Sequence, residues 1–266
     1  MKKYILAIDQ GTTSSRVVLY DSKFKIKSIE QKEFKQYFPN DGWVEHDAQE
    51  IWRDVEHLIR QTIKKNKLRP SQIISIGITN QRETTVLWNK KTGKPIHKAI
   101  VWQDRRTADY CDQLKLKKKD KIIQKITGLV LDPYFSATKI KWILDKISKN
   151  NKNQITDILF GTIDTWLLWK LTEGKSHYTD ITNASRTMIF DSNKEEWSKE
   201  LLKLFNINKS LLPEVKENAF NFGSTKLFGG NIVIGGMAGD QQAATIGQAC
   251  FNAGQSKSTY GTGCFL

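Results

Sequence analysis

The chain has 266 residues, of which 39% are hydrophobic and 10% aromatic, so it holds enough apolar material for a sizeable core and is not a disordered chain. Its 42 basic residues exceed its 28 acidic ones and give a formal net charge of +14, but 34 of the basic residues are lysines. Proteins that read nucleic acids depend more on arginine and on aromatic stacking. The charge therefore predicts a solvated surface and no nucleic-acid partner.

The length predicts one large domain or two modest ones. No apolar run approaches the ~20 residues of a membrane span, so we expect no integral membrane segment. The apolar stretch Tyr4–Ile8 is too short for a signal peptide, and a buried first strand is the better interpretation. Three separated cysteines, Cys111, Cys250 and Cys264, form no Cys-x-x-Cys pair, which indicates a reducing compartment and a cytoplasmic protein.

The expected elements begin with a hairpin, in which Tyr4–Ile8 and Arg16–Tyr20 are strands joined by a small polar segment containing Gly11. A third strand is expected within Ile26–Tyr37. Asp47 is a suitable N-cap for an amphipathic helix that ends near Lys65. Later strands are expected at Ile73–Ile78, Thr84–Trp88, Lys98–Trp102, Asp157–Phe160, Ile232–Ile234 and Ser256–Thr259, and later helices at Arg105–Leu114, Ser136–Ile147, Asp164–Leu171 and Trp197–Phe205, with one after Asp240 that runs through Cys250. This alternation predicts an α/β fold with a mixed sheet.

Three segments combine small hydroxyl residues, glycines and carboxylates at the ends of expected strands. In Asp9–Ser14, Gly11 allows close backbone approach to a phosphate, and Asp9 can hold a hydrated Mg²⁺. In Gly235–Gln242, Asp240 follows a strand at an expected helix N-terminus, where the helix dipole favours a carboxylate that accepts a hydroxyl proton. Ser258–Gly263 is a second turn suited to phosphate. Taken singly, the three are equally well explained as a polar hairpin tip, a helix cap and a plain hairpin loop.

Taken together, the motifs of this chain resemble the FGGY carbohydrate-kinase family, and within it the branch that acts on glycerol. Five segments carry the resemblance in order along the chain: Asp9–Arg16, Thr79–Thr84, Trp102–Thr107, Gly239–Ala244 and Tyr260–Phe265. The resemblance implies a ribonuclease H-like, actin-like ATPase fold, in which a mixed sheet is flanked by helices and two such domains face each other across a cleft. It further implies residues 1–250 as the polyol-binding N-terminal domain and residues 251–266 as the opening hairpin of a truncated, nucleotide-binding second domain.

The resemblance also implies an activity, the ATP-dependent phosphorylation of glycerol to sn-glycerol 3-phosphate, which is the first step of glycerol catabolism. It assigns proton acceptance to Asp240 and a water-mediated contact with Mg²⁺ to Asp9. Polyol contacts are assigned to Arg82, Glu83, Trp102, Tyr134, Asp240, Gln241 and Phe265, and contacts with the ATP phosphates to Thr12, Thr13, Ser14, Arg16 and Thr262. A charged donor beside a charged acceptor, as in Arg82-Glu83, suits a hydroxyl, which both donates and accepts.

Two alternatives remain at this point. The chain could belong to a kinase of another polyol or ketose in the same family, or it could be a catalytically inactive remnant that binds a polyol. The resemblance is also compatible with a homo-oligomer, and it leaves open whether the 266-residue form is active.

Overall fold

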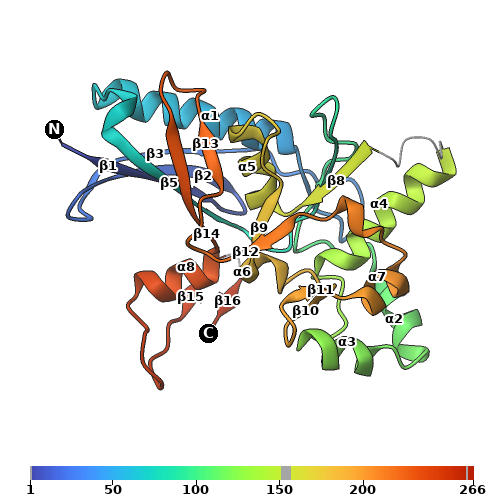
Figure 1. Ribbon diagram of the computed structural model, residues 1–266. Helices are drawn as coiled ribbons and strands as arrows, with labels where there is room; N and C mark the ends of the chain where they lie inside the picture. Colours follow the sequence, from blue (N-terminus) through green and yellow to red (C-terminus); the bar gives the residue numbers. More distant parts are fainter. Residues whose placement is uncertain (1, 151–156, 262) are drawn as a thin grey trace.

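A six-stranded mixed sheet forms one half of the computed structural model, which describes residues 2–150, 157–261 and 263–266 (Figure 1). The strand order is β13-β14-β5-β1-β2-β3. β1 pairs in parallel with β5, and β5 with β14, whereas β2, β3 and β13 join their neighbours in antiparallel pairs. The bounds are β1 Tyr4–Gln10, β2 Ser14–Asp21, β3 Ile26–Glu33, β5 Ile73–Asn80, β13 Gly223–Thr225 and β14 Ile232–Gly239.

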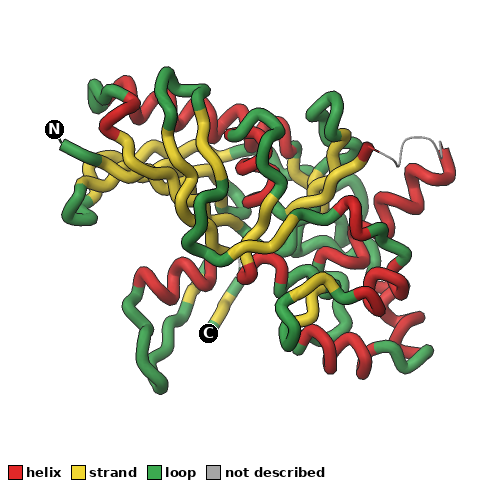
Figure 2. The backbone as a smooth tube through the Cα atoms, in the orientation of Figure 1, coloured by secondary structure: helices red, strands yellow, loops and turns green. Residues whose placement is uncertain are grey.

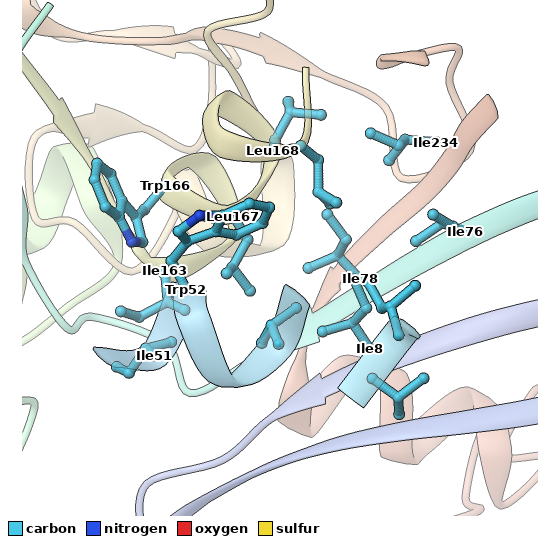
Figure 3. Close-up of a cluster of buried hydrophobic side chains, with 14 of the residues drawn as sticks. Ile8, Ile51, Trp52, Ile76, Ile78, Ile163, Trp166, Leu167, Leu168 and Ile234 are labelled. Atoms are coloured by element: carbon cyan, nitrogen blue, oxygen red, sulfur yellow. The ribbon is translucent and has the colours of Figure 1, made fainter. Parts of the chain in front are cut away.

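Two helices, α1 (Ala48–Lys65) and α5 (Ile163–Leu171), cover one face of this sheet. Their apolar side chains meet those of the central strands in one buried cluster, where Trp166 and Leu168 lie with Ile8 and Ile78 (Figure 3). α1 is amphipathic, as its spacing of apolar residues predicts, whereas α5 is buried nearly all round. The burial of these large side chains supplies the main driving force for this half of the fold.

Beside the sheet lies a mainly helical part of the molecule (Figure 2), whose apolar side chains form a second buried cluster. It includes Leu87, Phe160, Phe190 and Phe205, which come from short strands and helices far apart in the sequence. The remaining helices are α2 Ala108–Leu116, α3 Asp120–Thr127, α4 Ser136–Asn150, α6 Ile181–Ala184, α7 Lys199–Phe205 and α8 Asp240–Gly247, with 3₁₀ turns at Pro70–Gln72 and Lys209–Leu211. The remaining strands are β4 Glu45–His46, β6 Val86–Asn89, β7 Ala99–Ile100, β8 Ile158–Gly161, β9 Tyr178–Asp180, β10 Phe190–Asp191, β11 Glu196–Trp197, β12 Glu214–Lys216, β15 Thr259–Tyr260 and β16 Cys264–Phe265.

The predicted α/β class with a mixed sheet is confirmed, as is the N-terminal hairpin. Several boundaries were wrong. Ser14 and Ser15 belong to β2 and not to the connecting turn, Trp197 lies in β11 ahead of α7, and α8 ends at Gly247, short of Cys250. Sequence reasoning missed α3, an eight-residue helix that follows a lysine-rich run, although its apolar residues share one face and Ile123 is fully buried.

The last segment of the chain extends away from the sheet as an arm formed by α8 and the antiparallel pair β15–β16 (Figure 1). Phe251, Tyr260 and Leu266 in this arm expose most of their side chains to solvent. Within the part of the chain that the structure describes, no helix has the length and apolar character needed to cross a bilayer.

Candidate active site

Three parallel strands bring the candidate residues to one edge of the sheet. β1, β5 and β14 run in the same direction, and the residues Gln10, Asn80 and Gly239 at their ends stand in register. Ligands of open α/β sheets bind outside the carboxyl ends of such strands. Arg82 and Asp240 follow two of these ends and therefore lie close together.

A cavity of about 110 Å³ opens at this edge. A single water molecule needs ~10–15 Å³ of such volume, so the space suits a small ligand. Eight of the predicted site residues line it, namely Thr12, Arg82, Glu83, Trp102, Tyr134, Asp240, Gln241 and Phe265. Sequence reasoning therefore assembled the lining of one real cavity from residues spread over most of the chain.

The Arg82 guanidinium lies between two carboxylates. Its Nε is 3.2 Å from Oδ1 of Asp240 and 4.0 Å from Oε1 of Glu83. Although buried, this Nε has no partner of hydrogen-bonding geometry among the described residues. Gly239 is required beside it, since a Cβ at that position would stand 2.5 Å from Cδ of Arg82. An unsatisfied buried donor at a cavity is suited to a polar ligand.

Glu83 occupies an unusual backbone position at the floor of the site. Its φ is +61°, a left-handed conformation that is uncommon for a residue with a Cβ. The side chain is buried, and burial raises the pKa of its carboxyl group, while the charges of Arg82 and Arg186 oppose that rise. Arg186 Nε donates a 2.6 Å hydrogen bond to Oε1, which leaves Oε2 available to a ligand.

Asp240 is the first residue of α8, and its Oδ1 accepts a 2.7 Å hydrogen bond from the amide of Gln241. Burial raises the pKa of Asp240, and the nearby Arg82 counteracts this. A carboxylate made more basic in this way is better suited to accept a proton than an ordinary surface aspartate.

Aromatic rings form the walls of the cavity. The ring centroid of Trp102 lies 5.5 Å from that of Tyr134 and 6.2 Å from that of Phe265. The Trp102 indole donates a 2.9 Å hydrogen bond to Oγ1 of Thr12. Burial raises the pKa of Tyr134 to about 12, so its phenol stays protonated at neutral pH. These rings can cover C–H groups while Tyr134 offers a hydroxyl.

Four of the five proposed phosphate contacts, Thr12, Thr13, Ser14 and Arg16, lie on the β1–β2 hairpin, and of these four only Thr12 lines the cavity. Arg16 Nη1 is 3.4 Å from Oδ2 of Asp9, and Arg16 Nε donates to the Gln31 side chain at 3.1 Å. The hydroxyl of Ser14 accepts a 3.0 Å hydrogen bond from Gln31. Thr262 lies outside the described residues, and Thr13 lies in the turn itself.

The Asp9 carboxyl group is partly exposed at the end of β1. Burial raises its pKa, Arg16 lowers it, and the nearby charge of Asp240 raises it further. No group of three or more His, Cys, Asp or Glu side chains converges on one point in the described ranges. A single carboxylate of this kind fits Mg²⁺ that keeps several waters and is bound mainly by substrate phosphates.

Two cationic residues of the site escaped sequence reasoning. Arg186 contacts Glu83, and Lys257 Nζ lies 2.5 Å from Oε1 of Gln241 and 2.6 Å from Oγ1 of Thr259. The polar run Thr179–Arg186 was the only signal for Arg186, and nothing distinguished Lys257 from the many surface lysines.

Comparisons with known proteins agree with this geometry. Residues 4–247 match the family model described as "FGGY family of carbohydrate kinases, N-terminal domain". The chain is 56% identical to glycerol kinase of Clostridium botulinum (strain Hall) and 54% identical to that of Bacillus cereus (strain AH187). Each match covers 100% of this chain and 54% of the relative. The chain thus spans about half the length of the curated relatives it matches.

Solved structures give the same result. The crystal structure of Plasmodium falciparum glycerol kinase with ADP matches with a TM-score of 0.90 and 41% identity, over 99% of this chain and 53% of that one. Gluconate kinase from Lactobacillus acidophilus matches with a TM-score of 0.80 and 24% identity, over 93% of this chain and 50% of that one, which shows a shared fold. The expected actin-like ATPase fold is confirmed by these neighbours. The chain therefore belongs to the FGGY family of carbohydrate kinases.

Proposed function

We propose that this chain carries the glycerol-binding half of an ATP-dependent glycerol kinase. The observation that carries the proposal is the convergence of Arg82, Glu83 and Asp240 on one small cavity with aromatic walls. A three-carbon polyol needs a partner for each hydroxyl and apolar cover for its C–H edges. The high identity to glycerol kinases supports glycerol as the substrate.

Asp240 accepts the proton from the attacking terminal hydroxyl, since its carboxylate is partly buried and more basic than usual. Arg82 donates to the hydroxyls, and the free oxygen of Glu83 accepts from them. Trp102 and Phe265 contact the carbon skeleton, while Tyr134 and Gln241 complete the polar contacts. Phosphoryl transfer has a loose transition state, so positioning and charge neutralisation contribute more to the rate than proton removal does.

ATP with Mg²⁺ supplies the phosphoryl group and neutralises part of its charge. Thr12, Thr13, Ser14, Arg16 and Thr262 would hold the phosphates, and Asp9 would hold the metal through water. We assign residues 1–250 to the polyol-binding domain and residues 251–266 to the start of a second, nucleotide-binding domain. Such an enzyme would work in the cytoplasm, a compartment suited to the three free cysteines of the described chain.

The test uses residues 1–266 continued by the second half of the Clostridium botulinum relative, hereafter the joined protein. Its thermal melting shows whether it folds, and coupled detection of ADP measures turnover with glycerol, xylulose and gluconate. We expect turnover with glycerol to exceed turnover with the other two.

Two results would contradict the proposal. A preference for xylulose or gluconate would identify a kinase of a sibling substrate. A folded joined protein that binds glycerol but forms no ADP would identify a binding protein without catalysis.

A further inference from the structure

Residues 180–186 lie behind the cavity, at the end of β9, through α6 and into the turn that follows. Asp180 and Asn183 in this segment are fully buried. Neither Thr182 nor Arg186, the two residues whose side chains reach toward the site, lines the cavity itself. The segment therefore has extensive polar contacts without any direct contribution to the cavity wall.

One set of hydrogen bonds connects the segment to the backbone just before Asp240. Oγ1 of Thr182 accepts a 2.8 Å hydrogen bond from the amide of Gly239, and the Thr182 hydroxyl donates to the Asp180 carboxylate. The same carboxylate oxygen accepts a 2.8 Å hydrogen bond from Nδ2 of Asn218, which also donates to the carbonyl of Met237 at 2.8 Å. Asp180 thus fixes the last residues of β14 at two points.

A second set of hydrogen bonds connects the segment to Glu83 and to the end of β5. Arg186 Nε donates to Oε1 of Glu83 at 2.6 Å. The side chains of Asn183 and Asn80 exchange two hydrogen bonds, of 3.0 and 3.1 Å, at the end of β5. Because Glu83 follows Asn80 by three residues, this second set of hydrogen bonds holds both the Glu83 carboxylate and the nearby end of β5.

We propose that the 180–186 segment is a positioning element, which sets Asp240 through Thr182 and Glu83 through Arg186. The inference rests on the proposed function, in which these two carboxylates act on one small molecule. A misplacement of about 1 Å in such a pair can lower the rate roughly 10²-fold. Thr182 positions the proton acceptor Asp240, whereas Arg186 positions the binding contact Glu83, so substitutions at the two residues should have separate effects.

The first test replaces Thr182 in the joined protein. Thr182→Val keeps the shape but removes the acceptor for the Gly239 amide, so we expect turnover to fall roughly 10–100-fold, while the glycerol Kd from calorimetry stays within about threefold. Thr182→Ser keeps the hydroxyl and should restore turnover. Thr187→Val is the matched control, because Thr187 is a buried threonine of the adjoining turn whose hydroxyl contacts only nearby backbone: it donates to the Ala184 carbonyl and accepts a 3.4 Å hydrogen bond from the Ile189 amide.

The second test is Arg186→Met, which removes the cation beside Glu83. We expect glycerol binding to weaken roughly 10–100-fold, whereas turnover at saturating glycerol falls by less than about tenfold. The two variants should therefore separate, one changing turnover and the other changing affinity.

Three outcomes overturn the inference while leaving the proposed function intact. Thr182→Val with unchanged turnover is one, and an equal loss in Thr182→Val and Thr187→Val with the same drop in melting temperature is another. The third is a loss of turnover in Arg186→Met that matches the loss in Thr182→Val. Should Thr182→Val fail to fold, Thr182→Ala replaces it under the same criteria. A folded, unsubstituted joined protein without glycerol kinase activity would instead contradict the proposed function.

Discussion

Burial raises the pKa of Asp240, whereas the Arg82 guanidinium, 3.2 Å away, lowers it. In the joined protein, Asp240→Asn keeps the shape and the hydrogen-bonding capacity but removes the proton acceptor. We expect turnover to fall roughly 10²–10⁴-fold and the glycerol Kd to change less than about tenfold. Steady-state kinetics and calorimetry measure the two quantities. An Asn variant with more than a tenth of the original turnover would contradict the assignment.

Arg82 and Glu83 are oppositely charged neighbours that line the cavity. Removing either side chain deletes a charged hydrogen-bonding group that we assign to the polyol, so each alanine variant should weaken glycerol binding by about 1.5–3 kcal/mol. Calorimetry on the joined protein measures this. Arg105→Ala is a suitable control, because Arg105 is an exposed arginine paired with Asp132 outside the cavity. Unchanged affinity in both variants would place the polyol site elsewhere.

The same residues show how much of the candidate site the sequence predicts. Arg82 and Asp240 lie in motifs that follow expected strands, but their assignment to one site came from the resemblance to the FGGY family. Arg186 and Thr182 were missed because their partners, Glu83 and the Gly239 amide, lie 103 and 57 positions away in the chain. Contacts of that separation depend on the tertiary packing and leave no local pattern.

Asp47 caps the N-terminus of helix α1. Oδ1 of Asp47 accepts hydrogen bonds from the amides of Gln49 and Glu50, at 2.8 and 3.3 Å. Asp47→Ala leaves these amides without that partner and should lower the free energy of unfolding by about 1 kcal/mol. Urea unfolding of the joined protein measures the change. The exposed Asp41 gives a matched control, and an equal effect of Asp41→Ala would contradict the capping role.

The long amphipathic helix α1 was predicted, whereas the short pair β9–β12 was not. α1 was predicted because Asp47 marks its start and one stripe of apolar residues marks its buried face. It ends at Lys65, as expected. β9 and β12 contain three residues each and pair across a long stretch of sequence. Alternation over three residues carries too little information to predict a strand.

Buried histidines make the stability of the whole molecule depend on pH. His46 is fully buried, and burial lowers its pKa to about 3. As the pH falls below about 6.5, the unfolded chain binds a proton at this residue and the folded chain does not, so the free energy of unfolding decreases by about 2 kcal/mol by pH 5. This stability is present above pH 6.5 and is lost on acidification.

Unfolding of the joined protein at pH 7.5 and pH 5 measures that loss. His46→Gln should remove this contribution. Comparing the pH dependence of unfolding in this variant with that of the unsubstituted protein separates the contribution of His46 from those of all other titrating groups. The control is His57→Gln, since His57 is exposed on α1. An identical pH dependence in His46→Gln and the unsubstituted chain would contradict the prediction.

The isolated 266-residue chain provides the final prediction. Its relatives are about twice as long, and we propose that their second half supplies the other wall of the cleft. Alignment of the reacting groups can supply ~7–11 kcal/mol of barrier reduction, and losing half of that costs roughly three to four decades of rate.

We therefore expect weak glycerol binding at most, no measurable glycerol 3-phosphate formation, and aggregation promoted by exposed residues such as Phe251 and Tyr260. Light scattering and a radiolabelled phosphate-transfer assay measure these. Turnover within a hundredfold of a full-length relative would contradict the prediction.

The hydrogen bond from the Trp102 indole to Thr12 joins a wall of the polyol cavity to the hairpin assigned to the phosphates. A ligand that orders Trp102 thereby restrains Thr12 as well, so the two binding equilibria share a coupling free energy. Linkage requires this coupling to be reciprocal, so any factor by which glycerol tightens nucleotide binding is the factor by which the nucleotide tightens glycerol binding. In the proposed enzyme, this one side-chain contact would couple the occupancy of the cavity to that of the phosphate hairpin.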